Sequence, residues 1–180
     1  MKRTLLGIAL SVALVAAACS GATEQTATTT ETDVSITAEP AGDHTPAPAL
    51  AFLRFDGSEA TFADYAGQPL VVNFWASWCP SCVAELSAAF RPVQEAVGDE
   101  VAFLGINLQD DRADALRLVD ETGIAFDLAE DVSGDLYLEL GGIGMPFTVF
   151  IDSDGNVVEE HNGPLTEAQL LAMIEEAFSL

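Results

Sequence analysis

This sequence contains very little positive charge. It has 6 lysine and arginine residues against 29 Asp and Glu, which gives a formal net charge of −23. Beyond the first three residues the basic side chains are all arginines: Arg54, Arg91, Arg112 and Arg117. Binding of nucleic acid, or of anionic lipid through charge, requires cations that displace counterions, so we expect neither as a partner. The acidity favours solubility, with repulsion of unwanted partners as the alternative interpretation.

Cysteine and histidine are also scarce, with 3 Cys and 2 His in 180 residues. A structural zinc site usually takes four ligands of these kinds. Cys79 and Cys82 form one C-x-x-C pair, and neither Cys19, His44 nor His161 has the spacing of a second ligand pair. The scarcity therefore favours a redox pair over a zinc site. We assign no role to the histidines, and we expect no metal and no organic cofactor.

The N-terminal apolar run is too short to span a membrane comfortably. It covers residues 5–18 and follows Lys2 and Arg3. A run of this length behind basic residues predicts an export signal over residues 1–18 rather than a transmembrane helix. We therefore expect the protein to work outside the cytoplasm.

The end of this run resembles the lipobox of bacterial lipoproteins, in which a cysteine is acylated and becomes the mature N-terminus. Cys19 follows three alanines, and Ala16 stands where leucine is commoner. Ala16 and Ala18 also satisfy the ordinary signal peptidase pattern, so a secreted or periplasmic protein without lipid is the alternative. Because Cys19 is the odd one of three cysteines, we favour its lipidation. Several acyl chains would hold the protein at the outer face of a membrane.

Large apolar residues are nearly missing from the segment that follows. Residues 19–48 are rich in Thr, Ala, Glu and Pro. This composition cannot bury enough surface to offset the entropy of ordering, so it predicts a flexible acidic tether. The remaining residues, 49–180, are enough for one domain with its own core.

The residues around the cysteine pair predict a reactive thiol. An apolar strand over Leu70–Trp75 gives way to a helical pattern near Pro80, and proline suits the first helical position. Cys79 is then the N-cap residue, where unpaired N–H groups and the helix dipole favour thiolate over thiol. Cys82 follows one turn later, so the two sulfurs can close a small disulfide ring. A purely structural disulfide is the alternative, although one that closes so short a loop stabilises little.

The next residues predict a β-α-β unit. Five apolar positions keep helical spacing on one face: Val83, Leu86, Phe90, Val93 and Val97. Pro92 lies inside this helix and should kink it or end it early. Residues 101–108 form a second buried strand, so the two strands should be parallel with a right-handed crossover.

The second half of the domain predicts a β-β-α unit preceded by short elements. Residues 112–122 form a helix whose inward positions are expected at Ala113, Leu116 and Val119. The hairpin signal Asp154-Gly155 joins two antiparallel strands. The other expected elements are strands at 51–55, 126–129, 147–152 and 157–161, a helical turn at 61–67, a helix at 135–140, a mobile loop at 141–144, and a closing helix from the capping box at 166–169 to residue 178.

Taken together, four groups of residues resemble the thioredoxin fold. They are residues 73–82 (NFWASWCPSC), Glu85, the segment Gly144-Met145-Pro146 before a strand, and residues 151–155 (IDSDG) after it. More narrowly, the chain is similar to the TlpA/ResA/DsbE-type membrane-anchored thiol-disulfide oxidoreductases over about residues 50–180. The resemblance implies an α/β domain with a mixed central sheet flanked by helices on both faces.

The resemblance also implies roles for the residues around the cysteines. Cys79 would be the exposed nucleophile and Cys82 the resolving thiol, which together form the redox-active disulfide. Asn73 stands where cytoplasmic thioredoxins carry a buried Asp, so that carboxylate is missing. Glu85 matches the acidic residue of the extracytoplasmic branch and would handle the proton if burial raises its pKa, whereas a solvated helix glutamate is the alternative. Ser87 stands where the branch commonly has proline.

The implied substrate-binding residues lie on both sides of the cysteine pair. They are Trp78, Pro80, Met145 and Pro146, with Pro146 in the cis form and facing the cysteines. The exposed backbone at Met145 would pair with a client segment as an added strand. Phe147 departs from the family pattern, in which threonine is usual, and this change could alter the substrate groove.

The function implied is exchange of disulfides with cysteine-containing client proteins. Pro80-Ser81 supplies no positive charge to stabilise a thiolate, so we expect a moderately reducing pair. Such reductants in the family prepare apocytochrome c for haem attachment and are recharged by a membrane electron carrier. The alternatives are an oxidase of secreted protein thiols and, in another class, a Cu(I) carrier that uses the two thiolates. We expect a monomer.

Overall fold

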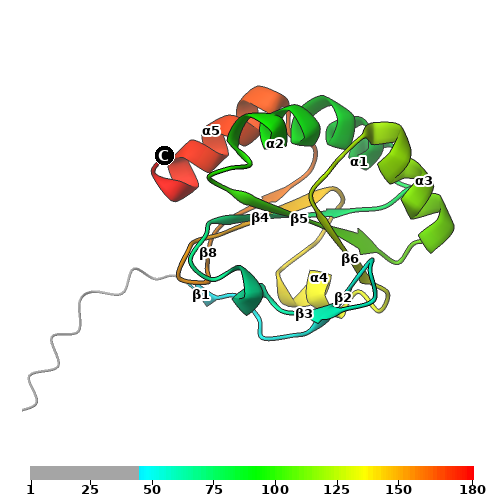
Figure 1. The fold of residues 1–180 in the computed structure, drawn as a ribbon, viewed down its shortest axis with the longest axis horizontal. Coiled ribbons are helices and arrows are strands. Elements are labelled where there is room, and N and C mark those ends of the chain that lie inside the picture. Colours follow the sequence, from blue (N-terminus) through cyan, green and yellow to red (C-terminus); the bar gives the residue numbers. More distant parts are fainter. Residues whose placement is uncertain (1–44) are drawn as a thin grey trace, which may run out of the picture. The chain divides into compact units, whose positions relative to one another are not determined.

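One mixed sheet of eight strands forms the central layer of residues 45–180, the part of the chain that the computed structural model describes (Figure 1). The predicted export signal, Cys19, His44 and the tether up to residue 44 lie outside the described residues. The strands are β1 (Thr45–Pro46), β2 (Phe52–Arg54), β3 (Glu59–Ala60), β4 (Leu70–Trp75), β5 (Ala102–Leu108), β6 (Asp127–Asp131), β7 (Phe147–Ile151) and β8 (Asn156–Asn162). Their order across the sheet is β1-β8-β7-β4-β5-β6-β2-β3.

The middle of the sheet confirms the predicted pairing of the two apolar strands. Strands β4 and β5 are parallel, β6 continues the parallel set beside β5, and β7 is antiparallel to β4. Every residue of β4 is buried. Its sequence, apolar except for Asn73, therefore reflects cover on both faces of the sheet rather than on one.

Helices cover both faces, which confirms the predicted fold class. They are the 3-10 turn η1 (Phe62–Tyr65), α1 (Pro80–Glu85), the π-helical turn η2 (Leu86–Phe90), α2 (Arg91–Val97), α3 (Arg112–Thr122), α4 (Asp135–Glu139) and α5 (Glu167–Phe178). Figure 1 shows α1, α2, α3 and α5 on one face of the sheet and α4 on the other. Within residues 45–180, none of the helices combines the length and the apolar character needed to cross a membrane.

Alternate side chains of β4 anchor the two halves of the core. Val71 and Trp75 belong to the cluster that includes the apolar residues of α1, η2, α2 and α5. Val72 and Phe74 belong to the cluster on the opposite face, with residues of η1, α4 and β7. Because strand side chains alternate between faces, β4 is held from both sides up to its last residue. The segment that follows β4 therefore leaves from a firmly held strand end.

Pro92 does not end the first long helix. An early end was one of the two outcomes that the sequence allowed, and a kink was the other. Between α1 and α2 the helix widens into the π turn η2, in which the Arg91 N–H bonds to the carbonyl of Leu86 five residues earlier. Proline has no N–H and its ring clashes with a carbonyl of the preceding turn, so the widened turn lets the chain continue past it. The predicted apolar face is confirmed, since Leu86, Phe90 and Val93 are buried.

The predicted inward face of α3 is only partly right: Val119 packs against the core, whereas Ala113 and Leu116 are exposed. The side chains that turn toward the sheet are Ala115, Leu118 and Thr122, whereas Leu116 remains 45% exposed. The helix begins one residue after its N-cap, Asp111, whose carboxylate accepts the N–H groups of residues 113 and 114. The buried side of α3 consists of Ala115, Leu118 and Thr122, and Leu116 points away from it.

The ends of the sheet differ in detail from the expectation. Strand β1 pairs with β8 through Thr45 and Pro46, so the sheet begins four residues before the predicted domain boundary at residue 49. An edge strand of this length needs only backbone pairing, which composition does not reveal. The β7–β8 hairpin around Gly155 and the capping box of Thr166 and Gln169 are confirmed.

Candidate active site

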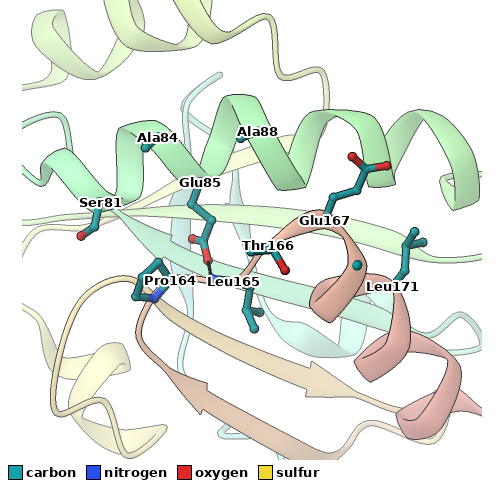
Figure 2. Close-up of a pocket in the computed structure, with 10 residues that line it drawn as sticks. Ser81, Ala84, Glu85, Ala88, Pro164, Leu165, Thr166, Glu167 and Leu171 are labelled. Atoms are coloured by element: carbon teal, nitrogen blue, oxygen red, sulfur yellow. Dashed lines mark hydrogen bonds between the residues drawn. The ribbon is translucent and has the colours of Figure 1, made fainter.

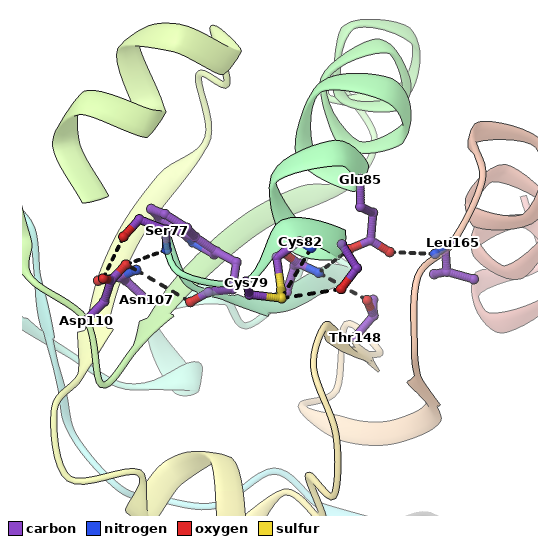
Figure 3. Close-up of a disulfide and its surroundings, with 11 residues drawn as sticks. Ser77, Cys79, Cys82, Glu85, Asn107, Asp110, Thr148 and Leu165 are labelled. Carbon is purple, nitrogen blue, oxygen red and sulfur yellow. Dashed lines mark hydrogen bonds between the residues drawn. A yellow bond between two sulfur atoms is a disulfide. The ribbon is translucent and has the colours of Figure 1, made fainter. Parts of the chain in front are cut away.

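A disulfide between Cys79 and Cys82 closes the turn between β4 and α1 (Figure 3). Their Cα atoms lie 5.3 Å apart and their sulfurs 2.09 Å apart. Cys79 has an extended backbone and is the N-cap of α1, and its Sγ accepts the Cys82 N–H at 3.3 Å. Pro80 occupies the first turn of the helix. The predicted cap is thus confirmed, and the sulfur of Cys79 lies where helix N–H groups favour negative charge.

The two cysteines differ in their access to solvent. Cys79 is 5% exposed and Cys82 is fully buried. Cys79 is therefore less exposed than the family resemblance implies, but it is the only one of the pair that another molecule can approach directly. The Ser81 hydroxyl lies 3.4 Å from its sulfur, and Trp78, directly before it, is 57% exposed. This asymmetry fits a pair in which one sulfur meets the partner and the other acts behind it.

The Met145-Pro146 peptide bond is cis, as the resemblance implies. In the sheet, Phe147 at the start of β7 lies opposite Phe74 near the end of β4. The residues before β7 and those after β4 therefore leave the sheet at the same end. Met145 packs against the core cluster that contains both cysteines, and within residues 45–180 its backbone N–H and carbonyl make no backbone hydrogen bond. They remain available to an added strand.

A buried polar cluster lies next to Cys82 on the core side of α1. Glu85 is only 3% exposed, and Asn73 and Thr148 are buried beside it. One Glu85 oxygen accepts the Leu165 N–H at 2.6 Å, and the other accepts the Asn73 Nδ2–H at 3.3 Å (Figure 3). The same Asn73 amide nitrogen lies 3.3 Å from the Thr148 hydroxyl, and its Oδ1 has no partner within the described residues. The alternative of a solvated helix glutamate is therefore wrong.

Burial controls the protonation of Glu85. Loss of water around the carboxylate raises its pKa to about 7, against the smaller, opposite effect of the hydrogen bonds from Leu165 and Asn73. A carboxyl group with such a pKa exchanges a proton readily near neutral pH. Because Glu85 stands one turn after Cys82 on the same helix, it is placed on the same face as the resolving sulfur.

A second carboxylate, which the sequence analysis missed, braces the loop before Cys79. Asp110 accepts the Ser77 N–H at 2.6 Å and the Ser77 hydroxyl at 2.7 Å. It also accepts the side chain of Asn107 at 2.9 Å and the N–H of Asp111 at 2.8 Å. Burial would raise the pKa of Asp110, but these four hydrogen bonds outweigh it and lower the pKa. The available signal was position, because Asp110 follows the carboxyl end of a parallel strand, where functional residues of α/β folds gather.

A groove of about 700 Å³ was also not predicted (Figure 2). It runs between α1 and the start of α5, with small residues of α1 on one side and the residues around Leu165 on the other. Ser81 and Glu85 both line it, so the groove extends from the neighbourhood of Cys79 to the buried carboxylate. No sequence pattern marks it, because its two walls are about 80 residues apart in the chain.

The structure thus brings together most of the residues that the sequence marked. Cys79, Cys82 and Glu85 lie on one helix, and Met145 and Pro146 lie at the same end of the sheet. Trp78 and Pro80 are exposed at the helix start. Among residues 45–180, no three His, Cys, Asp or Glu side chains converge in a way that could hold a metal ion.

Comparison with known proteins agrees with this geometry. The family model described as Redoxin matches residues 40–174. The thiol:disulfide interchange protein DsbE of Pseudomonas fluorescens biotype C is 35% identical over 143 residues, which cover 73% of this chain and 78% of that protein.

Solved structures show the same arrangement. The DsbF structure of MTB, in mixed oxidized and reduced forms, matches with a TM-score of 0.67 and 25% identity, covering 74% of this chain and 98% of that one. A thiol:disulfide interchange protein of the thioredoxin family from Chlorobium tepidum TLS matches with a TM-score of 0.66 and 26% identity, covering 76% and 97%. The fold is therefore shared with proteins named for thiol-disulfide exchange.

Replacement of Glu85 should change how stability depends on pH. Its pKa is raised from 4.5 to about 7, so between these values the folded protein holds a proton that the unfolded chain has released. The free energy of unfolding should therefore fall as pH rises through this window, by on the order of 3 kcal/mol, and level off above it. Urea unfolding from pH 4 to 8 should show this loss in the wild type and not in Glu85→Gln. Glu95→Gln, which removes an exposed carboxylate from α2, is the control and should follow the wild type.

Replacement of Asp110 should loosen the loop that carries Cys79. In Asp110→Asn the new amide group faces hydrogen-bond donors, so at least one of them loses its partner. We expect the free energy of unfolding to fall by about 1–3 kcal/mol, the usual cost of an unsatisfied buried polar group. Asp114→Asn makes the same charge change on α3, where the exposed Asp114 carboxylate pairs with Arg117, and should cost clearly less. Equal losses in the two variants would contradict the bracing role.

Proposed function

The chain belongs to the redoxin family and is a thiol-disulfide oxidoreductase of the DsbE type, and from that premise we propose that it reduces client proteins outside the cytoplasm through Cys79 and Cys82. The observation that carries the proposal is the asymmetric cysteine pair at the helix start. Cys79 caps α1 and is the accessible sulfur, whereas Cys82 is fully buried beneath it.

The first step is attack on a client disulfide by the thiolate of reduced Cys79. A new bond forms between the Cys79 sulfur and one client sulfur, and the client disulfide breaks. The other client sulfur leaves with the bonding electron pair and takes up a proton. The Cys82 N–H, which points at the Cys79 sulfur, and the helix dipole favour the thiolate needed for this attack.

The second step releases the client. The Cys82 thiol loses its proton and attacks the Cys79 sulfur, which forms the Cys79–Cys82 disulfide and frees the second client thiol. We assign Glu85 as the group that takes the Cys82 proton, because its carboxylate is buried on the same helix with a pKa raised to about 7. The groove that reaches Glu85 would then connect this proton to solvent. Starting from the Cys79 thiolate and the Cys82 thiol, the enzyme therefore loses two electrons and one proton, and the client gains two electrons and two protons, the second proton coming from solvent.

The client segment would be held by backbone at the cis-proline loop. Met145 presents an N–H and a carbonyl without backbone partners in the described residues, at the sheet end that carries the cysteines. Pairing through backbone atoms fixes the client cysteine near Cys79 with little demand on the client sequence. Trp78 and Pro80, both exposed, would line the other side.

The direction of exchange follows from the residues between the cysteines. Pro80 and Ser81 bring no positive charge, and the nearby carboxylates Glu85 and Asp110 do not favour an extra thiolate. Apart from the helix N–H groups at Cys79, nothing between the cysteines stabilises the reduced form, which favours a reductant over a strong oxidant. Preparation of apocytochrome c, with electrons from a membrane thiol carrier, is the use that we propose in the cell.

We further propose that Cys19 carries a lipid that tethers the domain to the outer face of the membrane. The support is the sequence around it, because Cys19 follows a short apolar run and three alanines. It is also the one cysteine outside the redox pair. The acidic segment after it would give the domain reach.

Cysteine variants test the chemistry. With glutathione disulfide as substrate, Cys82→Ser should accumulate a mixed disulfide on Cys79, seen as one glutathionyl group by mass spectrometry, whereas Cys79→Ser should form none because Cys82 is buried. The reduction potential of the wild-type pair should lie nearer to thioredoxin, about −270 mV, than to DsbA, about −120 mV. A reduction potential near that of DsbA would reverse the direction of exchange that we propose. A mixed disulfide on Cys82 instead of Cys79 would reverse the two roles.

Membrane fractionation tests the anchor. The wild-type chain, expressed in a bacterial host, should sediment with membranes and be extracted only by detergent, because several acyl chains hold a protein firmly. Cys19→Ser should appear in the soluble fraction. Cys79→Ser, which also removes one thiol, is the control and should stay with the membranes. Release of the wild type by salt alone would contradict a lipid anchor.

A further inference from the structure

The most exposed large apolar side chains of the described residues gather in one short segment. Among residues 45–180, Ile143 is 88% exposed, Val132 74% and Leu138 67%, which are the three highest values for large apolar residues. All three lie in α4 or in the turns on either side of it. Single exposed leucines are ordinary, but three highly exposed apolar residues within twelve positions of the chain make this segment a candidate interaction surface.

Hydrogen bonds hold this segment in place, so its exposure is not that of a loose loop. The buried Asp131 carboxylate accepts the N–H groups of Gly134 and Tyr137, both at 2.9 Å. After the helix, Gly142 N–H bonds to the Tyr137 carbonyl at 2.9 Å, and Ile143 N–H bonds to Asn162 Oδ1 at 3.1 Å. The apolar side chains are therefore presented on a fixed backbone, which lowers the entropy cost of binding.

The segment is connected to the active-site loop through Gln109. The Trp78 indole N–H bonds to the Gln109 carbonyl at 3.2 Å, and the Gln109 side chain bonds to the Ser133 carbonyl at 2.9 Å. Ser133 directly follows Val132. At its other end, the segment leads into Met145 and Pro146. It thus lies next to the site on both sides rather than on a remote face.

Its charge restricts what can bind there. Asp135 and Glu139 are exposed on α4, and residues 132–143 contain no Lys, Arg or His. A second copy of this chain, paired through the same surface, would set these carboxylates against each other without a compensating cation. An anionic lipid surface would be repelled for the same reason. The surface suits a segment that carries both apolar and positively charged side chains.

We propose that Val132, Leu138 and Ile143, with Asp135 and Glu139, form a docking surface, here named the α4 surface, for extended client segments that are apolar and basic beside their cysteine. The inference rests on the proposed function and specifies its clients. Binding there would add affinity beyond the backbone pairing at Met145, and would select unfolded or flexible clients over folded ones, whose apolar residues are buried.

Peptide substrates test the α4 surface separately from the sulfur chemistry. Two synthetic peptides, each with one cysteine linked to glutathione by a disulfide, would carry Leu and Lys, or Ser and Glu, next to that cysteine. The wild type should have the lower KM for the Leu-Lys peptide. The double variant Leu138→Ser with Ile143→Ser should raise that KM about tenfold, the loss expected from two half-buried aliphatic contacts, with kcat unchanged. Leu180→Ser, which removes an exposed leucine just after the end of α5, should leave KM unchanged.

Charge gives an independent measurement. Asp135→Asn with Glu139→Gln should weaken binding of the Leu-Lys peptide at low ionic strength, and the difference from the wild type should shrink at about 1 M salt. Equal KM values of the wild type for the two peptides, or no effect of the Leu138 and Ile143 changes, would overturn the proposal. So would a change from dimer to monomer in the double variant, which would assign the surface to self-association. Glutathione disulfide alone is the reference: if the wild type fails to exchange it, the proposed function fails, and if only the peptide preference is absent, the α4 surface fails.

Discussion

The central position of β4 is the constraint on which the whole site depends. The strand is buried along its full length, pairs with β5 on one side and β7 on the other, and anchors both halves of the core. Its last residue leads directly to the cysteine turn, and its pairing with β7 brings the cis-proline loop to the same end. A shift of one residue in this register would move every β4 side chain to the other face and separate the two loops. Precise placement of reactive sulfur thus follows from ordinary strand pairing.

Around this strand end, two carboxylates experience opposite environments. Glu85 is almost completely removed from water and accepts only two hydrogen bonds, from Leu165 and Asn73, so burial raises its pKa to about 7. Asp110 is also partly removed from water, but four donors surround it and lower its pKa. The first is suited to gain and lose a proton, and the second to remain charged and hold a loop. Residue type alone does not separate these roles, because the number of hydrogen-bond donors decides between them.

Several features of the fold required three-dimensional information. The π turn ahead of Pro92 depends on how the remainder of the helix packs, since an α-helix that simply ended was equally compatible with the sequence. The predicted inward face of α3 was only partly right, because the predicted set, Ala113, Leu116 and Val119, and the buried set, Ala115, Leu118 and Thr122, both keep helical spacing. Of the predicted set only Val119 packs against the core. Periodicity identifies a helix, but its rotation is set by the cap and by the shape of the surface it meets. Two of the three buried positions of α3, Ala115 and Thr122, carry small side chains, which a search for large apolar side chains does not detect.

By itself, the sequence determined the order of the longer strands and helices, but not the short edge strands β1 and β3, together with the helix start at Cys79 and Pro80 and the pairing of Cys79 with Cys82, because these features depend on neighbours a few residues apart. The structure alone decided which cysteine is accessible, that Glu85 is buried against Leu165 and Asn73, and that Asp110 holds Ser77. It also decided that the apolar residues around α4 are exposed next to the site. These are contacts between segments far apart in the chain, and burial and electrostatic environment arise only when tertiary packing brings such segments together.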